Sequence, residues 1–131
     1  MTIHGIGTDI VRVARIEESV QRYGERFAQR ILAPSEFEAY HRCRSSAAFL
    51  AKRFAAKEAA VKALGTGFAL GVGLRDIAVG REPGGRPTLI CTGRAAEICQ
   101  TYGIITTHLS LADEAEYAVA FVVMERGVGP R

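Results

Sequence analysis

The sequence predicts an α+β fold in which helices pack on one side of an antiparallel sheet. Segments typical of strands and helices occur in the order strand, three helices, two strands, helix, two strands. This order lacks the regular alternation that builds a parallel sheet, and strands that directly follow each other pair as antiparallel hairpins. The chain has 131 residues, 48% of them hydrophobic, which is enough to bury one core. We therefore expect a single domain that spans residues 1–131.

The chain opens with a strand and a long helical pattern. Residues 2–11 predict a strand, because isoleucine and valine recur around two glycines. Residues 12–32 carry apolar side chains three and four positions apart, which predicts one helix. Gly24 lies in the middle of this stretch and weakens it.

Two further helices are predicted before the first hairpin. Pro34 ends the preceding pattern, and Ser35 with Glu38 predicts a capping box that opens a short helix to about residue 42. Residues 46–64 predict the strongest helix of the chain, because they are rich in alanine and are followed by Gly65.

The second half of the chain predicts two hairpins with a helix between them. Residues 76–80 and 87–92 form the first pair of strands, 94–102 the helix, and 105–112 with 117–125 the closing hairpin. The last strand is apolar on both alternating faces, so it needs cover on both sides. A second copy of the chain would supply that cover; the alternative is a monomer whose own helices cover both faces.

Composition excludes several classes of protein. A chain with 48% hydrophobic and 24% charged residues is globular and not disordered. No apolar run approaches the roughly 20 residues that a membrane span needs. The N-terminal segment lacks the charged and apolar regions of a signal peptide. We therefore expect a cytoplasmic protein with no membrane partner.

The three cysteines do not suggest a disulfide or a metal centre. Cys43, Cys91 and Cys99 are odd in number and form no CxxC pair, which argues against a disulfide framework and against a tetrahedral zinc site. We expect them to be buried as small apolar groups.

Charge is distributed unevenly along the chain. Residues 1–65 carry 11 Lys+Arg and 7 Asp+Glu, whereas residues 66–131 carry 6 and 7. The basic half is expected to face an acidic partner. Fourteen of the 17 basic residues are arginine, and the three lysines, Lys52, Lys57 and Lys62, fall in one short window. A compact ammonium group is therefore favoured at these positions.

The helix predicted over residues 46–64 interrupts its own apolar face with cations. Arg53 and Lys57 fall within that face, which is formed by Phe49, Leu50, Phe54, Ala60, Val61 and Leu64. Buried cations need a partner, and a bound polyanion would supply one. The alternative is that the long stems reach solvent and that Glu58 and Lys62, four positions apart, form a weak surface pair.

Asp9 follows the glycine-rich segment Gly5–Thr8, where small residues allow a close approach of backbone or ligand. One interpretation is a cap for the following helix; the other is a carboxylate at a strand end that faces a cleft. Asp9 and Glu58 together suit Mg²⁺, which shares phosphate oxygens with a substrate. The pattern suggests phosphate chemistry, although neither a Walker A nor a dinucleotide-binding motif is present.

Four arginines of the first predicted helix lie within an arc of roughly 80°, at positions 12, 15, 22 and 26. A solvated basic face is one explanation, and a docking surface for an acidic protein or a nucleic acid is the other. No aromatic residues alternate with these arginines, so we expect no nucleic-acid partner.

Three motifs occur in order along nearly the whole chain. They are GIGTDIV at 5–11 with ARIE at 14–17, KRFAAKEAAVKALGTG at 52–67, and HLSL at 108–111. These segments resemble the signatures of the bacterial short-form 4′-phosphopantetheinyl transferases, the holo-acyl-carrier-protein synthases. The second motif is long and specific, whereas the third is weak alone. Arg12 departs from the family pattern, which often has an acid there, and makes the basic helix more positive.

The resemblance implies an activity and a fold. Such enzymes have the 4′-phosphopantetheinyl transferase fold and transfer 4′-phosphopantetheine from coenzyme A to a serine of apo acyl carrier protein. They release adenosine 3′,5′-bisphosphate, depend on Mg²⁺ and support fatty acid biosynthesis. The short bacterial form is typically a homotrimer with active sites between subunits. An alternative client is a carrier domain of a polyketide or peptide synthase.

The resemblance also assigns roles to residues. It implies that Asp9 and Glu58 bind the metal and that Lys62 stabilises the leaving group. Glu58, directly or through a metal-bound water, is the candidate base, with Asp9 as the weaker choice. The coenzyme would be bound by Arg53, Lys57, Lys62 and His108, and the carrier protein by Arg15, Arg22 and Arg26. The competing hypothesis is a non-catalytic adaptor that binds an acidic protein or RNA through its basic helix.

Overall fold

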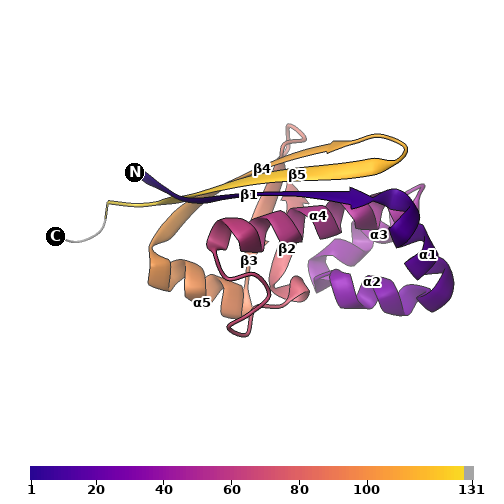
Figure 1. Cartoon of the computed structure of the whole chain (residues 1–131), viewed down its shortest axis with the longest axis horizontal. Coiled ribbons are helices and arrows are strands. Elements are labelled where there is room, and N and C mark those ends of the chain that lie inside the picture. The colour runs from indigo at the N-terminus through magenta and orange to yellow at the C-terminus, as the bar shows by residue number, and fades with distance from the viewer. Residues whose placement is uncertain (129–131) are drawn as a thin grey trace.

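The structure is a computed structural model that describes residues 1–128 and has the predicted α+β architecture (Figure 1). The strands fall into two sheets, a three-stranded sheet in the order β1-β5-β4 and a two-stranded sheet β2-β3, and all pairs are antiparallel. The elements are β1 (Thr2–Arg12), α1 (Val13–Tyr23), α2 (Glu25–Ile31), α3 (Phe37–Arg42), α4 (Ser46–Leu64), β2 (Ile77–Arg81), β3 (Pro87–Cys91), α5 (Gly93–Tyr102), β4 (Ile104–Asp113) and β5 (Tyr117–Arg126), with short 3₁₀ helices at Pro34–Glu36 and Leu74–Asp76.

Helix α4 runs beneath the three-stranded sheet, and the other elements surround it (Figure 1). Helices α1, α2 and α3 lie toward one end of α4, and α5 lies toward the other. The sequence predicted a single apolar face for α4. That prediction is wrong, because 12 of its residues are buried and they lie on all sides of the helix.

Strand β1 and helix α4 are in direct backbone contact. Gly5 and Gly7 face the helix, and a methyl group placed on either would collide with the carbonyl oxygen of Ala63 or Ala59. The glycine-rich start of the chain therefore serves the close approach of backbone that its composition suggested. The helix residues at this contact, Ala59 and Ala63, also have small side chains, which permit the close approach.

Two local predictions in the helical region are wrong. The stretch predicted as one helix over residues 12–32 is two helices, because Gly24 adopts φ 58° and ψ −138°, outside the helical region. The predicted capping box does not form at Ser35 and Glu38. Instead, the carboxylate of Glu36 accepts a hydrogen bond from the backbone N–H of Ala33 at 2.9 Å.

Within residues 1–128, no helix has the length and apolar character that crossing a bilayer requires. The three cysteines are free thiols that pack against the core, but they are half-buried and not fully buried as the sequence predicted.

Replacing Gly7 with alanine is expected to destabilise the fold by about 3 kcal/mol, because the new methyl group would displace the α4 backbone at Ala59. Urea unfolding followed by circular dichroism measures this change. Gly84→Ala is the matched control, since nothing lies within 4 Å of that position, and it should change stability by less than about 0.5 kcal/mol. Equal stability of both variants would contradict the proposed role of the contact.

Candidate functional site

Asp9 and Glu58 line the same cavity, although 49 positions separate them in the sequence. Asp9 lies near the end of β1, two residues after Gly7, and therefore on the same face of the sheet, the face that packs on α4. Glu58 extends from α4. The cavity has a volume of about 380 Å³, and Phe27, Phe54 and Arg15 contribute to its walls. The contact between β1 and α4 therefore brings the two predicted carboxylates together.

The third predicted group of this site, Lys62, binds Asp9. Its ammonium donates to Asp9 Oδ1 at 3.2 Å and to the carbonyl oxygen of Thr8 at 3.0 Å. Lys62 thus joins the helix to the strand, one turn beyond Glu58. The alternative interpretation, a surface pair between Glu58 and Lys62, is replaced by this ion pair.

The electrostatics of the cavity favour a cation. Burial and, secondarily, the negative charge of Asp9 raise the pKa of Glu58, while Lys62 partly opposes this rise. A carboxyl group with a raised pKa beside a second carboxylate gains from a bound positive charge. Among residues 1–128, no cluster of three or more His, Cys, Asp or Glu side chains could enclose a metal. Two carboxylates that leave other positions to water or phosphate fit Mg²⁺.

Asp9 does not cap the following helix. Arg12 occupies the N-cap position of α1, and no side chain there bonds to the helix N-terminus. The capping interpretation of Asp9 is therefore wrong, and its carboxylate faces the cavity and Lys62.

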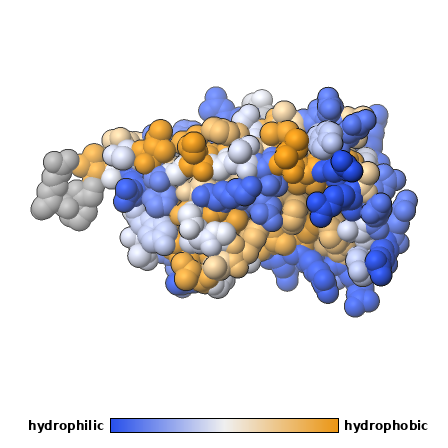
Figure 2. Space-filling view, in the orientation of Figure 1, coloured by the Kyte–Doolittle hydropathy of each residue, from blue (hydrophilic) through white to orange (hydrophobic). Residues whose placement is uncertain are grey.

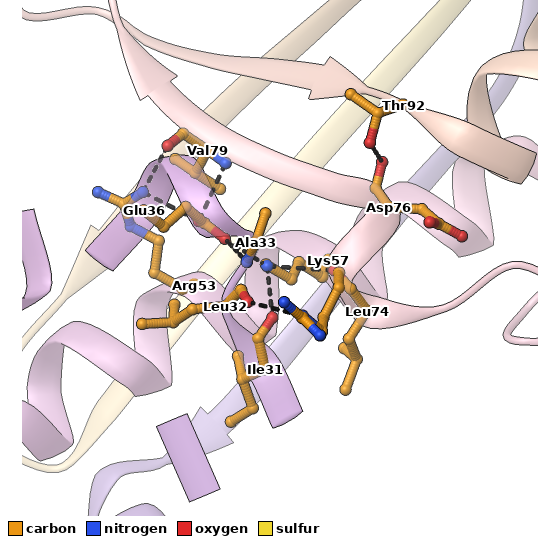
Figure 3. Close-up of polar contacts among 11 residues, drawn as sticks. Ile31, Leu32, Ala33, Glu36, Arg53, Lys57, Leu74, Asp76, Val79 and Thr92 are labelled. Carbon is orange, nitrogen blue, oxygen red and sulfur yellow. Dashed lines mark hydrogen bonds and ion pairs between the residues drawn. The ribbon is translucent and has the colours of Figure 1, made fainter. Parts of the chain in front are cut away.

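Arg53 and Lys57 find their partner within the protein (Figure 3). The fully buried Glu36 accepts hydrogen bonds from Lys57 Nζ at 2.5 Å and from the Arg53 guanidinium at 3.0 Å. The burial of these two cations is therefore compensated by Glu36 and does not require a bound polyanion. Lys57 has no exposed surface that a coenzyme could contact, which corrects its assignment to coenzyme binding.

Arg53 differs from Lys57 because part of it borders open space. It contributes to the wall of a second cavity of about 360 Å³, together with Arg42, Lys52 and Arg81. The Arg53 guanidinium also lies over the ring of Phe49, 4.4 Å from its centroid. Four cationic side chains around one cavity suit an anionic ligand.

His108 lies on the opposite face of the three-stranded sheet from Asp9. His108 pairs across β4 and β5 with Val123, which in turn pairs with Ile6 of β1. Gly7 faces α4, and successive residues of a strand point to opposite faces, so Ile6 and its partners Val123 and His108 face away from α4. The imidazole is 56% exposed and forms a hydrogen bond of 2.7 Å with Glu125. His108 borders a third cavity, of about 590 Å³, which Arg86 and Thr88 also line. One chain therefore does not bring His108 to Asp9 and Glu58.

Comparison with known proteins identifies the family. Residues 5–122, nearly the whole chain, match the family described as the 4′-phosphopantetheinyl transferase superfamily. The chain belongs to this superfamily. The holo-[acyl-carrier-protein] synthase of Halorhodospira halophila is 57% identical over 125 residues, which cover 95% of this chain and 99% of that protein. The resemblance seen in the sequence motifs is thus confirmed.

Solved structures of transferases of this kind share the fold. The holo-[acyl-carrier-protein] synthase of Neisseria meningitidis has a TM-score of 0.89 and 41% identity, and the match covers 95% of this chain and 100% of that one. The Bacillus anthracis holo-(acyl-carrier-protein) synthase in complex with CoA (3′,5′-ADP) has a TM-score of 0.80 and 36% identity, and the match covers 97% and 100% of the two chains.

The arginines expected to bind the carrier protein lie on two helices in this transferase. Arg15 borders the Asp9 cavity, Arg22 is in the last turn of α1, and Arg26 is on α2 beyond the break at Gly24. Arg22 and Arg26 are exposed. Figure 2 shows predominantly hydrophilic surface over α1 and α2, on the right of the molecule.

Sequence reasoning missed Glu36. It lies in the short segment between α2 and α3 and is completely enclosed by the fold. The only signal for it was indirect, since two cations within an apolar helix required an acidic partner. Several acids could have met that requirement, and periodicity does not distinguish among them.

Proposed function

We propose that this chain transfers the 4′-phosphopantetheine group of coenzyme A to a serine of apo acyl carrier protein and so supports fatty acid biosynthesis. Three findings support the proposal: membership of the superfamily, the activity named for the relatives, and a related structure in complex with CoA. The observation in this chain that carries it is the shared cavity of Asp9 and Glu58, with Lys62 bound to Asp9.

Asp9 and Glu58 would hold the Mg²⁺ ion, which, when bound, neutralises charge on the pyrophosphate of coenzyme A. Lys62 orients Asp9 and adds positive charge beside the leaving phosphate. Glu58, whose pKa is raised, is suited to accept the proton of the serine hydroxyl. The serine oxygen then bonds to the β-phosphorus, the bond from that phosphorus to the bridging oxygen breaks, and adenosine 3′,5′-bisphosphate leaves.

An enzyme fits this geometry better than the competing adaptor. An adaptor that used only its basic helix would not require Asp9 and Glu58 to share a cavity, whereas a transferase does. The second client class, carrier domains of polyketide or peptide synthases, uses the same chemistry. Parallel assays with both types of apo carrier distinguish the two clients.

The active unit in this proposal is a homotrimer. The sheet face that points away from α4 exposes large apolar side chains, including Ile6 at 60%, Ile10 at 62% and Phe121 at 44%. Figure 2 shows hydrophobic groups along the top of the molecule, over this sheet. An exposed apolar patch of this kind favours contact with another copy. The edge strands β1 and β4 carry Asp9 and His108, so a ring of chains would place one chain's His108 near its neighbour's Asp9.

In this proposal Arg15, Arg22 and Arg26 contact the acyl carrier protein. Arg15 borders the Asp9 cavity, and Arg22 and Arg26 are exposed on α1 and α2, so an acidic carrier that bound them could present its serine at that cavity. The cytoplasmic location expected from the sequence stays a prediction.

Asp9→Ala and Glu58→Ala should each lower the transfer rate by at least about 100-fold, because each removes a carboxylate from the shared cavity. The assay incubates protein, coenzyme A, Mg²⁺ and apo carrier and measures the intact-mass gain of the carrier. Glu38→Gln, which changes an exposed acid on α3, is the control and should transfer at the wild-type rate. An unmodified carrier with the wild-type protein would refute the proposed function.

Mixing two inactive variants tests the shared site. Asp9→Ala and His108→Ala chains, combined after reversible dissociation, should regain transfer, since some sites then pair an intact Asp9 with a neighbour's intact His108. Sedimentation of the same samples measures their assembly. Normal activity of wild-type monomers at high dilution would show that one chain suffices.

Arg15→Glu or Arg22→Glu should slow association with the acyl carrier protein by about 10-fold or more at low salt, with coenzyme A affinity nearly unchanged. Surface plasmon resonance against immobilised apo carrier measures the rates. Arg44→Glu, an exposed arginine between α3 and α4, controls for net charge. If all three substitutions slowed association equally, the slowing would come from the change in net charge, and the proposed docking surface would be contradicted.

A further inference from the structure

Glu36 collects four hydrogen-bond donors from separate parts of the chain (Figure 3). Its Oε1 accepts from Ala33 N–H at 2.9 Å and from Lys57 Nζ at 2.5 Å. Its Oε2 accepts from the Arg53 guanidinium at 3.0 Å and from Val79 N–H at 3.1 Å. The Glu36 carboxylate has no exposed surface and accepts from four donors, so its orientation is fixed. The same hydrogen bonds fix the positions of the four donor groups.

The two cations that Glu36 binds have different surroundings. Lys57 uses its remaining donors on the carbonyl oxygens of Ile31, at 2.6 Å, and Leu74, at 3.1 Å, and is sealed from solvent. Its contacts thus join α4 to the segments before and after it, which is a structural role. Arg53 also donates to the Val79 carbonyl oxygen, but its side chain retains 11% exposure at the cationic cavity.

We propose that Glu36 is a positioning residue for coenzyme binding, which acts by holding the Arg53 guanidinium in the wall of the cavity that Arg42, Lys52 and Arg81 also line. This inference rests on the proposed function, because it takes coenzyme A as the anionic ligand. Glu36 also contributes to the wall of this cavity, but its side chain has no exposed surface, so it acts on a ligand through Arg53. Its charge compensates Arg53 during burial and fixes one edge of the guanidinium, so that the group is preorganised for an anion.

The chemistry of the network explains why an acid is needed here. A glutamine has one oxygen and one NH₂ group, so it cannot accept from four donors as a carboxylate does. The amide would place N–H groups against either Arg53 and Val79 or Lys57 and Ala33. With its countercharge removed, the Arg53 guanidinium would be drawn toward solvent in the cavity and would leave its fixed position.

Glu36→Gln and Lys57→Met form a matched pair for the test. Both break the same buried ion pair and are expected to lower the melting temperature. Lys57→Met, however, leaves Glu36 bonded to Arg53, Ala33 and Val79, so Arg53 keeps its position. The measurements are the dissociation constant of coenzyme A by calorimetry, without carrier, and the KM for coenzyme A and kcat of transfer.

Glu36→Gln should weaken coenzyme A binding and raise its KM by about 10-fold with kcat within about 2-fold of wild type, whereas Lys57→Met should leave the dissociation constant within about 2-fold. Equal weakening by both variants would make Glu36 purely structural, and unchanged binding by Glu36→Gln would also overturn the proposal. If Glu36→Gln does not fold, the double variant Glu36→Gln/Lys57→Met is compared with Lys57→Met instead, because it carries no unpaired buried ammonium. Failure of the wild-type protein to modify any carrier would instead refute the proposed function. The calorimetric measurement, which needs no carrier, tests the role of Glu36 separately from that outcome.

Discussion

The direct contact between the backbones of β1 and α4 determines where the functional groups of this molecule lie. Gly5 and Gly7 meet the carbonyl oxygens of Ala63 and Ala59, so the strand and the helix run in opposite directions. Two residues of a strand advance roughly as far as one turn of a helix, about 6 Å, and the two elements therefore stay in register. Asp9 is the next strand residue that faces the helix. The cavity that it shares with Glu58 is a consequence of this register.

Adjacent residues of α4 are used in opposite ways. Lys57 is enclosed and bonded to three oxygens of the protein, whereas Glu58, the next residue, borders an open cavity. Because the helix is buried nearly all round, its two sides meet different neighbours, the Glu36 segment on one side and β1 on the other. The contacts of Lys57 with Glu36 fix the rotation of α4 about its axis, and this rotation sets the direction in which Glu58 points into the cavity.

Sequence reasoning succeeded where a local pattern had a single physical interpretation, as in the alanine-rich helix and the hairpins. The structure places Asp9 and Glu58 in one cavity, and the metal-binding chemistry assigned to them stays a prediction. Sequence reasoning failed at Gly24, where a glycine can either continue a helix or break it, and the tertiary structure chose the break. It also failed at Glu36, because the acid that neutralises Arg53 and Lys57 lies 17 and 21 positions away and is selected by packing. The position of His108 needed the strand register, which depends on pairings that periodicity does not reveal.

The pairing of β1 with β5 has a consequence for biosynthesis. β1 begins at Thr2, and its strand partner ends at Arg126, so the pair joins opposite ends of the described chain. A ribosome releases β1 long before β5 exists, and the alanine-rich helix α4 is the first extensive packing partner that the strand can meet. The nascent chain can thus dock Asp9 near Glu58 early, but the sheet that supports this strand closes only when translation reaches the last strand. Contacts so distant in sequence form slowly, which makes sheet closure the expected late step of folding.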